Sequence, residues 1–406
     1  MDFFDRLFGK PTLQGLTGKV TRGLRKRGAL DISANLELAE VTATIDGGPV
    51  RIYLGNVLAD YRRSPRSQRA AVLQKFLTSL APQEDAVPPR YEDAKPRLMP
   101  VVRSIADIGV ATLSAARLPP GAKPFSSPVH RPLVADMVVA LVCDSTTSMA
   151  YVTEEQVAQW QVDFQQALDQ AIHNLRGLPE AGGWKELAPG VWSGEWGDAY
   201  EASRILTPDL IHRLGVPEPV ALVPFRNALL VTSERNPAGL QLMLQVAQTS
   251  LEDNQRWLSF EPIRLAGDRW TAHDPAGESC ELLRVLRGRN NAATYSTQKQ
   301  LLDDLHQTSG TDIFVASYQL MQRDDEAPRS YTVWTEGVDT LLPPAELIAL
   351  VQPEGNNAKH VLVSWEDALA FAGDLLEPSD LVPIRYRARR FPAPHVLERL
   401  RERAVR

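Results

Sequence analysis

Three charged residues in the middle of the chain offer the functional groups of acid–base chemistry. Asp198, Glu201 and Arg204 lie close together in the segment 197–204. Two carboxylates act as a general acid and a general base when they converge across a cleft. If 199–206 is a strand, Glu201 and Arg204 lie on opposite faces, whereas in a helix they form an i,i+3 pair that Asp198 caps. We treat the three residues as catalytic candidates, with a structural role as the alternative.

A polar turn after the longest apolar run offers oxygen ligands for a metal ion. Asp144, Thr146 and Ser148 follow the run 133–143. Their spacing is similar to the first metal-binding loop of von Willebrand A domains, whose Asp-x-Ser-x-Ser pattern supplies hard oxygen donors. Such a site also needs a distant Thr and a second Asp, and the segment 230–234 has a Thr and a Glu but no Asp. Because these residue types also form ordinary turns, a simple hairpin tip is the alternative.

The sequence lacks the familiar catalytic and cofactor-binding motifs. It contains no GxxxxGK[ST], GxGxxG, GxSxG or HExxH pattern, so the usual arguments for a nucleotide, dinucleotide or hydrolase site do not apply. The seven histidines are scattered, and the two cysteines, Cys143 and Cys280, are far apart. This spacing fits neither a zinc site nor a disulfide framework. We therefore predict no cofactor and identify no small-molecule ligand.

Positive charge is concentrated at the two ends of a chain whose net charge is −6. Residues 1–28 carry +5 and residues 385–406 carry +6, which leaves −17 for the residues between. The basic ends either fold back on this acidic body or bind an external anion, a nucleic acid or a lipid headgroup. The candidate anion-binding residues are Arg385, Arg387, Arg389 and Arg390.

The N-terminal basic segment has the pattern of an amphipathic helix. Leu13, Leu16, Val20 and Leu24 recur at three- and four-residue spacing, which places them on one stripe of a helix. The stripe covers either the protein's own core or a membrane surface.

Alternating apolar residues, glycine turns and helix caps predict a series of β-hairpins, each followed by a helix. Asp46-Gly47 between two alternating runs is a strong hairpin signal. The predicted hairpins span 36–54, 134–152, 191–206 around Trp196-Gly197-Asp198, 220–232 and 260–273. The predicted helices begin at Ser64-Pro65, at the Thr153–Gln156 capping box, whose helix runs to 175, and at Asn236-Pro237.

The C-terminal part is predicted to mix strands and helices. Strands are expected at 313–321, 331–335, 360–364 and 382–390. Helices are expected at 297–307, after Pro343-Pro344, at 365–375 with Ser364 as the cap, and in the Arg-rich terminal segment. Hairpins with intervening helices indicate an α+β fold with mostly antiparallel sheets.

Composition divides the 406 residues into five segments and two to three domains. Ten prolines make 82–132 a connector without regular elements, apart from a short helix near 103–115. The predicted segments are a basic amphipathic arm (1–28), a hairpin–helix unit (29–82), the Pro-rich connector (83–132), a central α+β domain (133–276) and a C-terminal α+β domain with an Arg-rich terminal helix (277–406).

Several motifs between residues 30 and 275 carry a resemblance to a known family. They are Tyr53-Leu54-Gly55-Asn56 with Asp60-Tyr61, Leu133 to Val139 with Asp144, His173-Asn174-Leu175, Gly197 to Arg204, and Val220 to Leu230. Together they resemble the YtpQ-like family of bacterial proteins, a domain of unknown function. The resemblance implies a soluble intracellular α+β protein and assigns no catalytic residue.

These observations favour a non-enzymatic, cytoplasmic binding or scaffold protein, whose partner is another protein or a second copy. Acids at the N-terminus argue against an export signal, and no apolar run is long enough to span a bilayer. One alternative is a metal-dependent hydrolase that uses the Asp144 turn or Asp198 with Glu201. The other is a protein that binds nucleic acid or a membrane surface through its basic ends.

Overall fold

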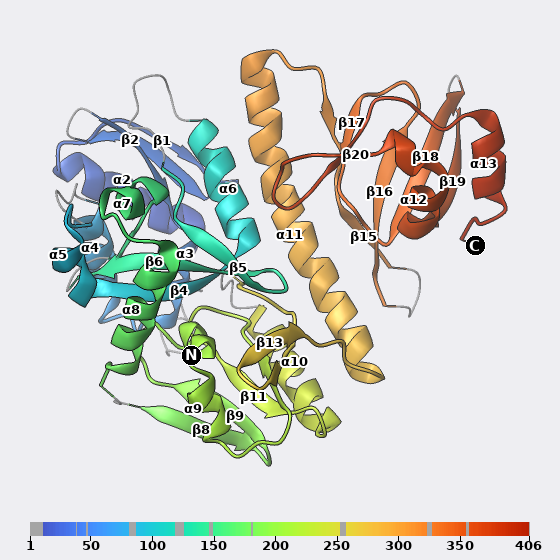
Figure 1. Ribbon diagram of the computed structural model, residues 1–406. Coiled ribbons are helices and arrows are strands. Elements are labelled where there is room, and N and C mark those ends of the chain that lie inside the picture. The colour runs from blue at the N-terminus through green and yellow to red at the C-terminus, as the bar shows by residue number, and fades with distance from the viewer. Residues whose placement is uncertain are drawn as a thin grey trace. The chain divides into compact units, whose positions relative to one another are not determined.

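The computed structural model divides the chain into two compact units, residues 1–104 with 118–275 and residues 105–117 with 276–406. Figure 1 shows helices and mostly antiparallel sheets in both units, so the predicted α+β fold is confirmed. The structure describes residues 11–37, 39–45, 48–80, 87–117, 126–145, 149–179, 182–251, 257–322, 327–354 and 357–405. No helix of these segments is both long and apolar enough to cross a membrane.

From residue 11 onward, the first part of the first unit is a three-stranded antiparallel sheet with three helices. The sheet has the order β1-β2-β3, and the elements are α2 (Leu13–Lys26), β1 (Leu30–Asn35), β2 (Glu40–Ile45), β3 (Gly48–Tyr53), α3 (Gly55–Arg63) and α4 (Arg69–Ser79). The apolar stripe of α2 is buried in the core of this sheet and its helices. The described part of the basic arm, α2, therefore packs its apolar stripe on the protein's own core, which was one of the two predicted alternatives. Helix α4 begins at Arg69 and not at Ser64, which ends α3.

The second sheet of this unit corrects the predicted connector. Its order is β4-β6-β5, and β7 also pairs with β6; the strands are β4 (Leu98–Ser104), β5 (His130–Val134), β6 (Met137–Asp144) and β7 (Met149–Tyr151). Every residue of β4 is buried, although 82–132 was expected to lack strands. Pro100 fits because β4 is an edge strand: Val102, two residues on, directs its N–H to the Ser203 hydroxyl and not to β6.

Four short helices adjoin this sheet: α5 (Tyr91–Ala94), η1 (Lys95–Arg97), α7 (Glu154–Gln159) and α8 (Phe164–Arg176). The predicted capping box is confirmed, because Thr153 and Gln156 exchange hydrogen bonds. The single helix expected to run to 175 is instead two helices. Gln161 has a positive φ of 57°, and the Asp163 carboxylate caps α8 by accepting the Gln166 N–H at 2.7 Å.

A six-stranded antiparallel sheet completes the first unit. Its order is β13-β12-β10-β11-β9-β8, with β8 (Gly183–Ala188), β9 (Val191–Glu195), η2 (Ala202–Leu206), α9 (Pro208–His212), β10 (Pro219–Leu222), β11 (Leu230–Ser233), α10 (Pro237–Leu251), β12 (Ile263–Ala266) and β13 (Arg269–Ala272). The hairpins at 220–232 and 260–273 are confirmed. The hairpin at 191–206 is wrong: β9 pairs with the preceding β8, and 202–206 form a 3₁₀ helix.

The second unit contains two four-stranded sheets and a long helix. The first sheet has the order β14-β17-β21-β20 and the second β15-β16-β18-β19. Their elements are α6 (Ile105–Ala116), α11 (Glu278–Ser309), β14 (Phe314–Val315), β15 (Gln319–Met321), β16 (Arg329–Thr335), β17 (Thr340–Leu342), β18 (Leu347–Glu354), β19 (Asn357–Ser364), α12 (Trp365–Ala372), η3 (Gly373–Leu375), β20 (Glu377–Pro378), β21 (Tyr386–Ala388) and α13 (Pro394–Arg401).

Three predictions for this unit need correction. The single strand expected at 313–321 is two strands, β14 and β15, which belong to different sheets. The helix expected after Pro343-Pro344 is the strand β18, which pairs with both β16 and β19. The helix expected at 297–307 begins nineteen residues earlier, at Glu278. The Ser364 cap of α12 is confirmed, because its hydroxyl accepts the Asp367 N–H at 3.0 Å.

Candidate functional site

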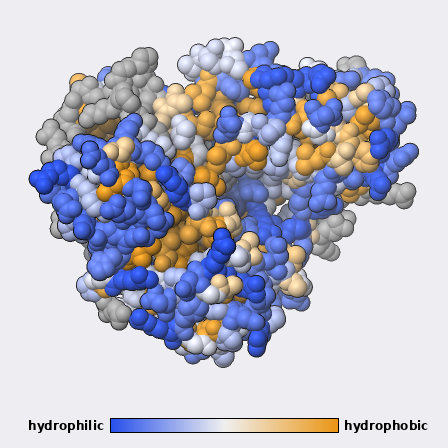
Figure 2. Space-filling model, in the orientation of Figure 1, coloured by the Kyte–Doolittle hydropathy of each residue, from blue (hydrophilic) through white to orange (hydrophobic). Residues whose placement is uncertain are grey.

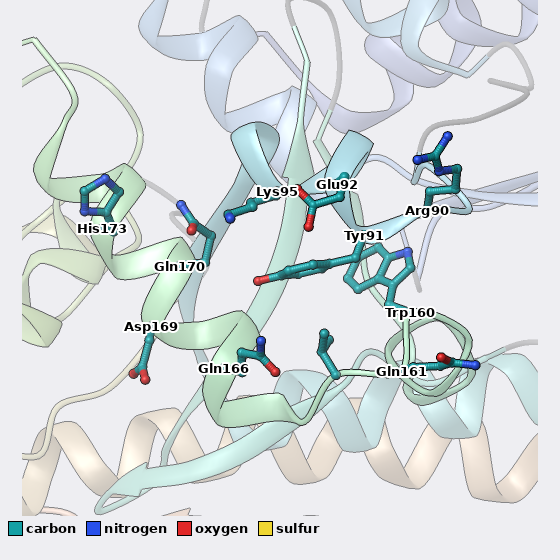
Figure 3. Close-up of a pocket in the computed structure, with 11 residues that line it drawn as sticks. Arg90, Tyr91, Glu92, Lys95, Trp160, Gln161, Gln166, Asp169, Gln170 and His173 are labelled. Carbon is teal, nitrogen blue, oxygen red and sulfur yellow. The ribbon is translucent and has the colours of Figure 1, made fainter.

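A solvent-open groove of about 680 Å³ lies between α5 with η1 on one side and α8 on the other. Figure 3 shows side chains from both sides directed into it. In Figure 2 the surface over α5 and α8 is mostly hydrophilic. The groove is therefore suited to a polar ligand rather than to an apolar one.

Helix α8 supplies one wall through a stripe of polar side chains. Gln166, Asp169, Gln170 and His173 line the groove, and their spacing of three and four residues places them on one face of the helix. The apolar residues of the same helix are buried in the core. The amphipathic pattern that anchors α8 thus also presents its polar face to the groove.

Two aromatic side chains from distant segments meet in the groove. The Tyr91 and Trp160 rings lie 5.8 Å apart at an interplanar angle of 53°. The Trp160 indole donates a hydrogen bond to the Pro88 carbonyl at 2.9 Å, which fixes the ring. Figure 3 shows the Tyr91 ring extending across the groove with its hydroxyl directed toward α8. Burial, with a contribution from the Glu92 charge, raises the pKa of Tyr91 above its usual value, so the hydroxyl keeps its proton at neutral pH.

One asparagine holds the two walls in place. The Asn174 side chain on α8 donates hydrogen bonds to the carbonyls of Lys95 and Leu98, each at 2.8 Å. Gln170 donates to the Asn174 side-chain oxygen at 2.8 Å. Because η1 and the start of β4 are bonded directly to α8, the groove is a preformed feature.

Several groups in the groove have no hydrogen bond to the protein. Within the described segments, the Tyr91 hydroxyl and the side-chain amides of Gln161 and Gln166 lack a protein partner. The charges of the groove are mixed, because Arg90 and Lys95 are matched by Glu92 and Asp169. An arrangement of this kind can bind hydroxyl and amide groups through hydrogen bonds, but it has no strong preference for a charged ligand.

Sequence reasoning did not find this groove. Tyr91 lies in the segment predicted to be a connector, and the sequence predicts a helix up to residue 175 without indicating what its polar face contacts. The i, i+4 pair of Gln166 and Gln170 indicates a polar face on the predicted helix. It does not say which segment faces the helix.

The structure uses the catalytic candidates Asp198 and Arg204 as an ion pair. The guanidinium donates to both carboxylate oxygens, at 2.9 and 2.5 Å, and lies 4.3 Å from the Trp196 ring centre. The Tyr200 N–H adds a hydrogen bond at 3.0 Å. Burial opposes ionisation, but these hydrogen bonds outweigh it and lower the pKa of Asp198. Asp198 is therefore an ionised structural partner and a poor proton donor.

Glu201 has a different environment from the one expected in a strand or in a helix. It is 4% exposed, and one carboxylate oxygen accepts the Gly197 N–H at 2.8 Å. Gly197 has a φ of 74°, a conformation that glycine adopts without strain. Glu201 thus closes this turn instead of pairing with Arg204 as an i,i+3 partner.

The metal-site prediction can be examined only at Asp144, because Thr146 and Ser148 lie outside the described residues. Asp144 accepts the Tyr200 hydroxyl at 2.7 Å, and its main-chain carbonyl accepts a hydrogen bond from Arg97 at 3.1 Å. The proposed second ligand segment is bonded elsewhere: the Thr232 hydroxyl donates to the Gly190 carbonyl. In the part of the chain that the structure describes, no three His, Cys, Asp or Glu residues are placed to share a metal ion.

Arg385 corrects the predicted anion-binding surface. It is fully buried, and its guanidinium donates to the carbonyls of Ala316, Leu341 and Tyr295 and to the Gln298 side chain. A side chain in this position cannot reach an external anion.

The other three arginines of this set lie nearer the surface. Arg387 pairs with Asp339 at 2.7 Å and Arg389 pairs with Glu377 at 3.3 Å, while Arg390 is exposed. For these three residues, anion binding stays a prediction.

Comparison of the chain with protein-family models, curated proteins and solved structures found no match. The resemblance to the YtpQ-like family therefore stays a prediction that depends on the sequence motifs alone.

Proposed function

We propose that this protein is a binding module whose groove between α5 and α8 takes an extended, polar segment of a partner polypeptide. The observation that carries the proposal is the set of unbonded groups in a preformed groove: the Tyr91 hydroxyl and the amides of Gln161 and Gln166. Polar groups that line a groove and lack a protein partner are available to hydrogen-bond a ligand.

The dimensions favour a short stretch of extended chain. From Gln166 to His173 the axis of α8 rises about 10 Å, which matches about three residues of an extended peptide at roughly 3.3 Å each. Peptide groups carry both a donor and an acceptor, and a glutamine side chain pairs with both. The Tyr91 ring offers an apolar face of the kind that packs against a side chain of the bound segment.

The free cysteines support a location for this activity. Cys143 is buried and Cys280 is exposed, and both are unpaired. Such thiols suit a reducing compartment, and we propose the cytoplasm.

A peptide library tests the proposal. Displayed heptapeptides are selected on the full chain, and the enriched peptides are titrated by calorimetry. We expect Tyr91→Phe, which removes only the hydroxyl, and Gln166→Ala each to weaken binding about fivefold or more.

The matched control is Arg176→Gln, since Arg176 is exposed on the same helix, does not line the groove and pairs with Asp209, which does not line it either. This variant should bind within about twofold of the wild type. Peptides that bind all three variants equally, or a library without enriched sequences, would contradict the proposal.

A further inference from the structure

Part of the edge strand β19 has main-chain groups that the sheet does not use. Two hydrogen bonds show which N–H and C=O groups of β19 point toward β18 and which point away from it. The Glu336 N–H donates to the Val351 carbonyl at 2.9 Å, so this carbonyl faces away from β19; Val351 is paired with His360. On the outer side of β19, the Val405 N–H donates to the Leu362 carbonyl at 2.8 Å. In an antiparallel pair such directions alternate along the strand, so His360 and Ala358 direct their N–H and C=O groups away from β18.

These outward groups are free in the described chain. No backbone or side-chain hydrogen bond to the main chain of Ala358 or His360 occurs there, and both residues are exposed. Up to residue 405, where the description of the chain ends, the C-terminal tail bonds to this edge at Leu362. The remaining free stretch, residues 357–361, is about 13 Å to 16 Å long, which suits four or five residues of an added strand.

A cavity flanks each side of this free edge. The first, of about 500 Å³, lies on the α13 side and is lined by residues that include Lys359, Leu350 and Leu397. The second, of about 540 Å³, is lined by residues of the opposite sheet face that include Leu362, Ala349 and Tyr331. Successive side chains of an added strand point to opposite faces, so they would enter the two cavities in turn.

The charge of the cavities indicates the chemistry of the occupant. Lys359, His360 and Arg401 line them, and none of their described lining residues is an acid. Lys359 has a surface ion pair with Glu354 at 2.8 Å, which is worth at most about 1 kcal/mol and is easily exchanged. Lysine on an edge strand also discourages pairing with uncharged strands. His360 and Arg401 line both cavities, whereas Lys359 lines the one on the α13 side, which thus favours acidic side chains. The other cavity is lined mainly by apolar residues such as Met321, Leu362 and Val405, and it favours apolar side chains.

We propose that β19 accepts an extended segment of a partner protein by strand addition, and that this segment alternates acidic and apolar residues. Main-chain hydrogen bonds to Ala358 and His360 supply affinity, and the two cavities select the side chains. This site lies in the second unit and does not depend on the groove between α5 and α8.

The test uses a labelled, end-blocked peptide of alternating Glu and Val, six residues long, titrated with the full chain by fluorescence polarisation. We expect saturable binding, and at least about tenfold weaker binding of the peptide with Lys in place of Glu. Two further peptides are N-methylated, one at every Glu and the other at every Val. Because only alternate residues of an added strand donate to its neighbour, one methylation pattern should weaken binding at least about tenfold and the other should not.

Protein variants give a second, independent readout. His360→Pro removes an N–H that β18 does not use, so the fold tolerates it, and binding should fall about tenfold. The matched variant His360→Ala keeps the N–H and should stay within about threefold. Equal effects of the two methylation patterns, or absent binding by the Glu-Val peptide, would overturn the proposal. A dimer in sedimentation velocity that His360→Pro dissociates would also overturn it, by identifying a second copy as the occupant.

Discussion

Arg204 in the first unit and Arg385 in the second are both nearly inaccessible, yet the protein satisfies their charges in different ways. Arg204, 5% exposed, forms a two-point ion pair with Asp198 and stacks on Trp196. Arg385, fully buried, has only neutral hydrogen-bond acceptors among the described residues.

This difference shows in the pKa values of the groups. Burial lowers the pKa of Arg385 to about 10, which still leaves the guanidinium charged at neutral pH. At the other site the arginine lowers the pKa of the acid, Asp198, despite burial. A carboxylate partner compensates the charge itself, whereas carbonyl oxygens solvate it through hydrogen bonds alone. Arg385 thereby ties together α11, β17 and the segment after β14, and its loss affects several elements at once.

The largest expected effect is that of Arg385→Met. It removes a donor shared by three buried carbonyls and the Gln298 side chain, of which the Leu341 carbonyl keeps a hydrogen bond from the Ala316 N–H. We expect the second unit to lose about 3–5 kcal/mol of unfolding free energy. Hydrogen exchange followed by mass spectrometry measures the protection of residues 276–406, and so reports the stability of the second unit separately from that of the first. The control Arg390→Met, at an exposed position, should change stability by less than about 0.5 kcal/mol. If Arg385→Met loses no more unfolding free energy than Arg390→Met, the hydrogen bonds from Arg385 to neutral acceptors contribute little to stability.

A smaller effect is expected for Arg204→Met. Asp198 then keeps the Tyr200 N–H and partial access to water, since its side chain is 25% exposed. We expect a loss of about 2–3 kcal/mol in urea unfolding of the first unit. Arg204→Lys retains the charge but not the two-point geometry, so its unfolding free energy should lie between those of the wild type and Arg204→Met. If Arg204→Met destabilises more than Arg385→Met, the proposed ranking of the two sites is wrong.

The smallest effect concerns pH. The pKa of Asp198 is lower in the folded state than in the unfolded chain, so its ionisation stabilises the fold above the unfolded pKa of about 3.9 and ceases to do so as pH falls through the folded pKa. Asp198→Asn should cost about 1–2 kcal/mol at pH 6. The difference between variant and wild type should shrink below about pH 4, and a difference that stays constant to pH 3 would rule out this linkage. Arg385 makes no contribution to this acid transition.

Local patterns predicted many elements correctly because local energetics decide them. The apolar stripe of α2, the capping box at Thr153 and the Ser364 cap of α12 depend on residues within one or two helical turns. The strand β18 was mistaken for a helix because a short apolar run fits either element, and its pairing with both β16 and β19 decides between them. The buried strand β4 was missed because proline density was read without knowing that Pro100 lies on a sheet edge.

By itself the sequence determined the α+β class, the caps at Thr153 and Ser364, most hairpins and the amphipathic face of α2, since each follows from residues near one another in the chain. Only the tertiary structure decided which polar faces meet. Tyr91 faces the polar stripe of α8 across the groove because Asn174 on α8 bonds to the carbonyls of Lys95 and Leu98. The tertiary structure likewise buries Arg385 among main-chain carbonyls and pairs Asp198 with Arg204. Such contacts join segments whose proximity depends on the packing of whole elements, and no local periodicity records that packing.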